Sequence, residues 1–198
     1  HSLASTRFIM ETKSVAIIGA GVSGLAACKH LLERGCRPTV FEADTVLGGV
    51  WAHVPDCTRL QSPRTMYQYS DFPWPDSVTE MNPDHRQVLD YLDAYARRFG
   101  VLECVRFGHR VVGMEYVGVD EETVAAWEDW AGNGHAFGSG DGEWRLTVAN
   151  AEGHVEVTIY YASSRIFHPL LRHFILYLSF HSSVYGGRSK INTPCRFH

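Results

Sequence analysis

The 198-residue sequence lacks several patterns that would each point to a particular class of protein. Its five cysteines are odd in number and include no CxxC pair, which argues against a disulfide framework and a zinc site and favours a reducing compartment. No uninterrupted apolar run approaches the roughly eighteen residues of a membrane-spanning helix. A net charge of −4 provides no basic surface for nucleic acid. These absences predict a globular, cytoplasmic protein without a nucleic-acid partner.

Acidic residues are absent from the end of the chain. All 22 Asp and Glu lie in residues 1–156, whereas residues 157–198 contain five Lys or Arg, eight aromatic residues and four histidines. This abrupt change predicts a domain at residues 14–156 and a divergent tail at residues 157–198. Residues 1–13 are expected to be a leader outside the fold.

The tail allows two interpretations. Residues 170–180 fit an amphipathic segment on a membrane surface, which would make the protein membrane-peripheral, or sequence that was never selected to fold. We favour the second interpretation and expect no membrane association. His168, His173 and His181 lack the spacing of helical metal ligands, so no metal site is predicted.

A strand, a glycine-rich turn and a helix follow one another near the start of the chain. Residues 14–18 are a short apolar run, typical of a fully buried strand in a parallel sheet. The sequence GAGVSG, which we call the glycine turn, occupies residues 19–24. Residues 25–34 have helical apolar spacing, and Gly35 is typical of a helix end. The helix should bury Leu25, Cys28, Leu31 and Leu32.

A second apolar run, residues 38–42, ends in an acid, Glu42, 23 residues after Gly19. This order is that of a dinucleotide-binding βαβ unit. Gly19 permits the tight turn, Gly21 lets the backbone approach a pyrophosphate, and Gly24 lets the helix pack closely on the strand. The free N–H groups at the helix start would hold the phosphates. Glu42 would accept hydrogen bonds from ribose hydroxyls and disfavour a 2′-phosphate.

Two further motifs follow: LGGVW at residues 47–51 and YSDFPWP at residues 69–75, which we call the aromatic loop. Together with the glycine turn and Glu42, they stand in the order and spacing found in flavin-containing monooxygenases. Over residues 14–156 the chain closely resembles the amino-terminal, FAD-binding part of that family, in particular of its plant-type members.

The resemblance implies an α/β fold: a Rossmann-like FAD-binding domain with a parallel sheet and a β-meander, incomplete at its C-terminus. It also implies an FAD-dependent, NADPH-using monooxygenase. In this family a C4a-hydroperoxyflavin oxygenates a soft nitrogen or sulfur nucleophile, so a small amine or sulfur compound and molecular oxygen are the implied partners. Because the cofactor carries the chemistry, the protein must bind the cofactor, orient it and exclude water from it. The lack of a Ser/His/Asp set, an HExxH motif or a P-loop is consistent with this.

The same resemblance assigns site residues. Gln61 and Ser62 lie where the family usually approaches flavin and nicotinamide with an Asn-centred pair. Gln61 is the one candidate catalytic residue, but it departs from the animal pattern and fits an ordinary loop residue equally well. Glu42 would bind the ribose. The remaining FAD contacts would be the pyrophosphate-binding Gly19, Ala20, Gly21, Val22, Ser23 and Gly24, and the flavin-side Gly49, Val50 and Trp51.

A second helix is expected to follow the aromatic loop. Asn82 is predicted as its N-cap and Pro83 as its first residue, and Gly100 should end it. The exposed polar residues of this helix are expected to include His85, Arg97 and Arg98.

Strands and a hairpin complete the expected scaffold. Single strands are predicted at residues 101–107 and 110–117, and a hairpin at residues 144–149 and 154–161. Residues 120–143, rich in acids and glycines, are expected to form a solvated insertion with Trp127 and Trp130 packed at one end.

Two features of the family do not occur in the sequence. There is no second GxGxxG turn for NADPH, and no strand-plus-glycine segment that closes the FAD site after the hairpin. The NADPH site is therefore expected to be mostly absent from this chain, which we interpret as a truncated, inactive form of the enzyme. The alternatives are a non-catalytic FAD- or nucleotide-binding fragment and a plain NAD-dependent Rossmann protein.

Overall fold

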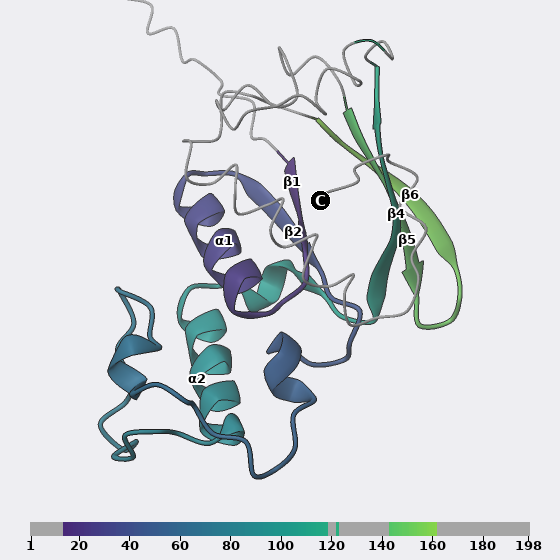
Figure 1. Ribbon diagram of the computed structural model, residues 1–198. Coiled ribbons are helices and arrows are strands. Elements are labelled where there is room, and N and C mark those ends of the chain that lie inside the picture. Colours follow the sequence, from purple (N-terminus) through teal and green to yellow (C-terminus); the bar gives the residue numbers. More distant parts are fainter. Residues whose placement is uncertain (1–13, 119–121, 123–142, 162–198) are drawn as a thin grey trace, which may run out of the picture.

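The computed structural model describes residues 14–118, 122 and 143–161 (Figure 1). Its first sheet is parallel, with the strand order β1–β2–β3. The strands are β1 (Ser14–Ile18), β2 (Arg37–Phe41) and β3 (Val105–Arg106). Helix α1 (Val22–Glu33) connects β1 to β2, and Gly35 follows it with a φ of +73°. The predicted βαβ unit is confirmed.

The second sheet is antiparallel, with the order β4–β5–β6. Its strands are β4 (His109–Val117), β5 (Glu143–Asn150) and β6 (Val155–Tyr161). The Asn150 side chain closes the hairpin between β5 and β6, because its Oδ1 accepts the N–H groups of Glu152 at 3.1 Å and His154 at 2.9 Å. The hairpin was predicted correctly, and β6 continues past residue 156 to Tyr161.

The parallel sheet lies between α1 and the antiparallel sheet (Figure 1). On one side, α1 buries Leu25, Cys28 and Leu31 as predicted, while Leu32 is half-buried. On the other side, Phe41 of β2 packs against Leu146 and Val148 of β5. Strand β1 is less buried than predicted: its alternate residues Val15 and Ile17 are buried, but Ser14 is exposed and Ala16 and Ile18 are half-buried.

Helix α2 (His85–Arg98) begins two residues later than predicted, because Asp84 is its N-cap. The Asp84 carboxylate accepts the Gln87 N–H, and the Gln87 side chain accepts the Asp84 N–H, both at 3.0 Å, which is a capping box. Asn82 does not cap the helix, since its amide donates to the carbonyls of Leu60 at 3.0 Å and Ser62 at 3.1 Å. Gly100 follows the helix with a φ of +69°.

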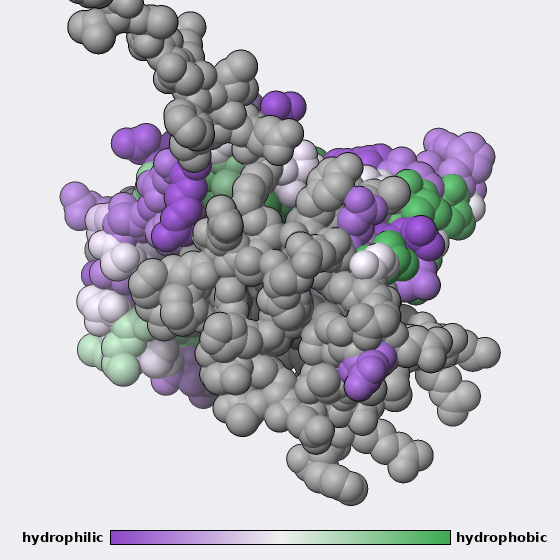
Figure 2. Space-filling model, turned by 90° about the horizontal axis from the view of Figure 1, so that it is seen from above, coloured by the Kyte–Doolittle hydropathy of each residue, from purple (hydrophilic) through white to green (hydrophobic). Residues whose placement is uncertain are grey.

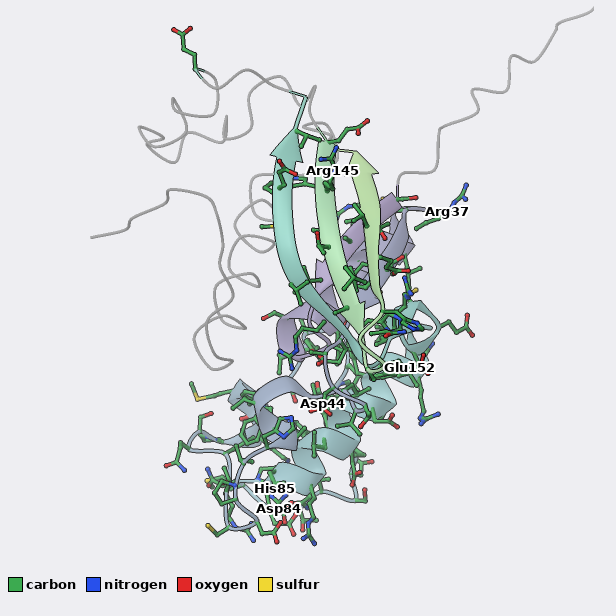
Figure 3. The ribbon with its side chains drawn as sticks, turned by 90° about the vertical axis from the view of Figure 1, so that its right-hand side faces the viewer. Arg37, Asp44, Asp84, His85, Arg145 and Glu152 are labelled. Carbon is green, nitrogen blue, oxygen red and sulfur yellow. The ribbon has the colours of Figure 1, made fainter. Side chains whose placement is uncertain are left out.

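The prediction that His85 lies on a solvated surface is wrong. Its side chain is buried, with Nε2 3.6 Å from the Asp56 carboxylate, and its backbone N–H donates to the Thr58 carbonyl. The preceding loop therefore covers the first turn of α2, which lies at the end of the helix remote from both sheets (Figure 3). Arg97 and Arg98 are exposed, as predicted.

The strand predicted at residues 101–107 is mostly a turn. A short 3₁₀ helix, η3 (Leu102–Cys104), precedes the two-residue strand β3. Two other 3₁₀ turns are η1 (Gly49–Ala52) and η2 (Arg64–Met66). The predicted insertion at residues 120–143 lies almost entirely outside the described residues. The predicted tail, residues 157–198, lies outside them from residue 162 onward.

Some of the exposed apolar residues lie on the antiparallel sheet. Figure 2 shows hydrophobic residues gathered on that side of the molecule. Its exposed valines are Val112 of β4 and Val155 and Val157 of β6. Among the described residues, none of the helices combines the length and apolarity needed to cross a bilayer.

Candidate functional site

The glycine turn joins the ends of β1 and β2 to the start of α1. Gly19 has a φ of +93°, which favours glycine, and its N–H donates to the Phe41 carbonyl at 2.8 Å. A Cβ on Gly24 would lie 1.9 Å from the Gly19 carbonyl oxygen. The absence of a side chain at Gly24 therefore lets α1 cross closely over the turn, which confirms the packing role expected from the sequence.

The N-terminus of α1 carries none of the usual stabilising groups of its own. Gly21 is the N-cap and has no side chain to accept a hydrogen bond, and the first turn contains no acid. No hydrogen bond to the N–H of Val22 or Ser23 is found within the described part of the chain. These N–H groups and the positive end of the helix dipole are available to an anion.

Glu42 places its carboxylate against the glycine turn. It is only 8% exposed, its Oε2 accepts the Ala20 N–H at 2.7 Å, and its Oε1 accepts the Asp44 N–H at 2.8 Å. A carboxylate can accept about four hydrogen bonds. The group therefore has two protein donors that fix its orientation and still has acceptor capacity for a hydroxyl-bearing ligand.

The LGGVW segment contacts the same turn. The Gly48 N–H donates to the Ala20 carbonyl at 3.0 Å, and Gly48 and Gly49 have φ values of +115° and +57°. A Cβ on Gly49 would lie 3.2 Å from the Gly21 Cα. Two glycine backbones thus approach each other directly, and a side chain at Gly49 would crowd the Gly21 backbone.

The aromatic loop contacts α1 at two points. The Tyr69 hydroxyl donates to the carbonyl of Val22, the first residue of α1, at 2.6 Å. Two turns further along, the Lys29 ammonium donates to the Asp71 carboxylate at 2.5 Å and lies 2.8 Å from that of Glu33. Neither contact was predicted from the sequence. The only signal was an acid placed between aromatic residues in the loop.

Hydrogen bonding shifts the pKa values of the Lys29 pair. The bond from Lys29 holds the pKa of Asp71 below its ordinary value of 3.8. The bonds to Asp71 and then to Glu33 raise the pKa of Lys29 above 10.5. The ion pair between Lys29 and Asp71 therefore stabilises the fold fully between pH 3.8 and pH 10.5, the ordinary pKa values of the two groups. It is lost as pH falls through the lowered pKa of Asp71, or as pH rises through the raised pKa of Lys29.

The remaining predicted site residues are less closely tied to the turn. The Trp51 indole N–H donates to the Tyr67 hydroxyl at 2.7 Å, and the Val50 side chain is 68% exposed. Gln61 is exposed and its amide donates to the Arg59 carbonyl at 3.2 Å. Ser62 is half-buried. Within the described residues, no hydrogen bond connects Gln61 or Ser62 to the glycine turn.

Comparison with known proteins places the chain in a family. The sequence profile described as "FMO-like: Flavin-binding monooxygenase-like" matches residues 12–132. "Probable flavin-containing monooxygenase 1" of Arabidopsis thaliana is 45% identical over 123 residues, which cover 61% of this chain and 23% of the relative. "Flavin-containing monooxygenase 1" of Canis lupus familiaris is 44% identical over 109 residues, which cover 50% and 20%. The chain spans less than a quarter of the length of these relatives.

Solved structures share the fold. The S-allyl-L-cysteine S-oxygenase of Allium sativum superposes with a TM-score of 0.56 at 24% identity, covering 75% of this chain and 34% of that one. The bacillithiol disulfide reductase of Bacillus cereus gives 0.54 at 23% identity, covering 74% and 37%. The profile match extends over more than half of the chain. The chain therefore belongs to the flavin-binding monooxygenase-like family, with the Rossmann-like α/β fold expected from its sequence.

Proposed function

We propose that residues 14–156 bind FAD and form the amino-terminal, FAD-binding part of a flavin-dependent monooxygenase. The observation that supports this most strongly is the meeting of four separated sequence motifs at the start of α1. Ala20 contacts both Glu42 and Gly48, and Val22 accepts a hydrogen bond from Tyr69 of the aromatic loop. These contacts join segments that lie up to 47 residues apart in the sequence.

The residues at this site fit an FAD diphosphate and ribose. Backbone N–H groups without partners among the described residues suit phosphate oxygens, and no atom lies within 4 Å of the position that a Cβ on Gly19 would take. The buried Glu42 carboxylate suits ribose hydroxyls. In this proposal the FAD-binding residues are Gly19, Ala20, Gly21, Val22, Ser23, Gly24 and Glu42, with Gly49, Val50, Trp51, Gln61 and Ser62 toward the flavin.

Bound FAD would supply the redox chemistry for oxygenating a soft nitrogen or sulfur atom of a small molecule. The described residues contribute binding and orientation. The Glu42 carboxylate, fixed by two backbone donors, carries a negative charge where a 2′-phosphate would have to lie, so it selects FAD over NADPH at this turn.

We expect Glu42→Gln to weaken FAD binding by about 10- to 100-fold, because a charge-assisted hydrogen bond contributes about 1.5–3 kcal/mol. Glutamine keeps nearly the same shape but only one oxygen acceptor, so either the Ala20 or the Asp44 N–H loses its acceptor, and circular dichroism must first show that the variant is folded. The measurement is titration of FAD into the 198-residue chain, followed by flavin fluorescence.

Glu115→Gln is the matched control for this experiment. It makes the same change of charge on β4, where Glu115 forms an exposed ion pair with Arg145. FAD affinity should remain at the wild-type level. Equal FAD affinity for Glu42→Gln and wild type would refute the ribose assignment, and a wild-type chain that binds no FAD would refute the proposed function.

We also expect that the 198-residue chain alone does not turn over substrate with NADPH. Its sequence contains one GxGxxG turn, and Glu42 makes that turn unfavourable for a 2′-phosphate. This supports a non-catalytic, FAD-binding fragment as the second candidate function. The test is NADPH-dependent oxygen uptake with FAD and an amine or sulfide substrate, with Gly21→Ala as the control. Uptake with product well above that control would show that the chain is catalytic.

A further inference from the structure

We propose that Tyr69 is a positioning residue for FAD binding. Its hydroxyl, held in place by the Asp71–Lys29 ion pair, fixes the first turn of α1 in the conformation that receives the diphosphate. This inference rests on the proposed function. It assigns a role in ligand binding to the aromatic loop, which would otherwise have only a structural role.

The first turn of α1 needs stabilisation from outside the helix. Its N-cap, Gly21, provides no side-chain acceptor, and no acid in the first turn complements the helix dipole. An N-terminal turn without these groups tends to fray. The Tyr69 hydroxyl, 2.6 Å from the Val22 carbonyl, is a side-chain group from elsewhere in the fold that contacts this turn directly.

The two contacts of the loop lie on one face of α1. Val22 and Lys29 are seven residues apart, which is about two helical turns, so the Val22 carbonyl and the Lys29 side chain lie on the same side of the helix. Tyr69 and Asp71 are two residues apart, and both side chains reach α1. The ion pair therefore sets the position of the loop along α1, and with it the position of the Tyr69 hydroxyl.

Helix α2 holds the other side of the loop. The Tyr69 ring stacks on Tyr95 with a centroid distance of 3.9 Å, and the Tyr69 N–H donates to the Tyr91 hydroxyl at 2.8 Å. That same hydroxyl donates to the Phe72 carbonyl at 2.5 Å. Tyr69 is thereby fixed between α1 and α2 and has little freedom to leave the Val22 carbonyl.

Lys29 makes the position of the loop specific. Its side chain is buried, its ammonium lies 5.1 Å from the centre of the Phe99 ring, and its carboxylate partners are Asp71 and Glu33. A buried ammonium is costly unless it is paired. A shift of the loop that separated Asp71 from Lys29 would leave Glu33, whose side chain is 53% exposed, as the remaining partner. This disfavours other positions of the loop.

A preordered first turn should favour ligand binding, because the ligand then does not have to order it. Tyr69→Phe keeps the ring stacked on Tyr95 and removes only the hydroxyl. We expect Tyr69→Phe and Asp71→Asn each to weaken FAD binding by three- to tenfold. Without FAD, the amide hydrogen of Leu25, which donates to the Gly21 carbonyl at 3.0 Å, should also exchange faster in both variants.

The control is Gly35→Ala, which destabilises the opposite end of the same helix. Gly35 has a φ of +73° and no atom within 4 Å of an added Cβ, so its cost is backbone strain alone. The full 198-residue chain is used for each variant. FAD dissociation constants come from flavin fluorescence, stability without FAD from urea unfolding, and local opening from amide hydrogen exchange.

The positioning role predicts that Gly35→Ala loses stability yet keeps wild-type FAD affinity and wild-type exchange of the Leu25 amide hydrogen. The inference is overturned if Tyr69→Phe keeps wild-type affinity, or if Gly35→Ala weakens FAD binding as much as Tyr69→Phe does. In both cases wild-type FAD binding leaves the proposed function standing. If the wild-type chain binds no FAD, the proposed function and this inference fall together.

Discussion

Gly24→Ala is expected to lower the free energy of unfolding of the chain by at least about 3 kcal/mol. Helix propensity alone predicts the opposite sign, since alanine is about 1 kcal/mol better than glycine in a helix interior. The clash decides the outcome, because the new Cβ would lie 1.9 Å from the Gly19 carbonyl oxygen and 3.1 Å from its carbon. Both are backbone atoms at the junction of β1 and α1, so no side-chain rotation can relieve the contact.

The measurement is urea unfolding followed by far-UV circular dichroism, with Gly35→Ala as the reference. Gly35 ends the same helix in open space, and alanine there should cost about 1 kcal/mol of backbone strain. We expect wild type to be the most stable, Gly35→Ala to be less stable, and Gly24→Ala to be the least stable. A Gly24→Ala midpoint at or above that of wild type would show that α1 does not pack on the turn as described.

The βαβ unit could be predicted because its determinants are local. Gly19 needs a positive φ, Gly24 needs close packing, and the apolar positions of α1 repeat at helical spacing within one short segment. The hairpin was predictable for the same reason, since Asn150 and Gly153 lie within the turn that they form. In each case the residues that fix the backbone are neighbours in the sequence.

The errors occurred where a distant segment decides the outcome. Asparagine is a favoured N-cap residue, but the Asn82 side-chain amide donates to the carbonyls of Leu60 and Ser62. The helix begins after Asp84 instead. His85 is buried because the loop around Thr58 packs against the start of α2. No periodicity near residue 85 contains that information.

The candidate site likewise contains residues that could be predicted from the sequence and residues that could not. The glycine turn and Glu42 were found from spacing, and the structure brings them together through the Ala20–Glu42 hydrogen bond. Lys29 was overlooked, because a lysine on an amphipathic helix is normally solvated. Its burial depends on Asp71, 42 residues away, and only the tertiary structure shows this pairing.

The contrast between Gly21 and Gly24 leads to the second large effect. Gly21 has a φ of −82°, which alanine adopts freely, and an added Cβ would lie 3.7 Å from the Gly49 Cα, an ordinary contact. The free chain should therefore accept Gly21→Ala without strain. The methyl group would nevertheless fill the space between the two glycine backbones, beside the N–H groups that we propose to bind the diphosphate.

Gly21→Ala is accordingly expected to leave the urea midpoint of the free chain near that of wild type while weakening FAD binding at least 100-fold, or about 2.7 kcal/mol. FAD titration with flavin fluorescence measures the binding, and circular dichroism checks the fold. Gly35→Ala should give the reverse pattern, with lower stability and unchanged affinity. Wild-type FAD affinity in a folded Gly21→Ala chain would mean that FAD binds elsewhere. If the Gly21→Ala chain is unfolded, the space between Gly21 and Gly49 is smaller than described, because a Cβ 3.7 Å from the Gly49 Cα would not destabilise the fold.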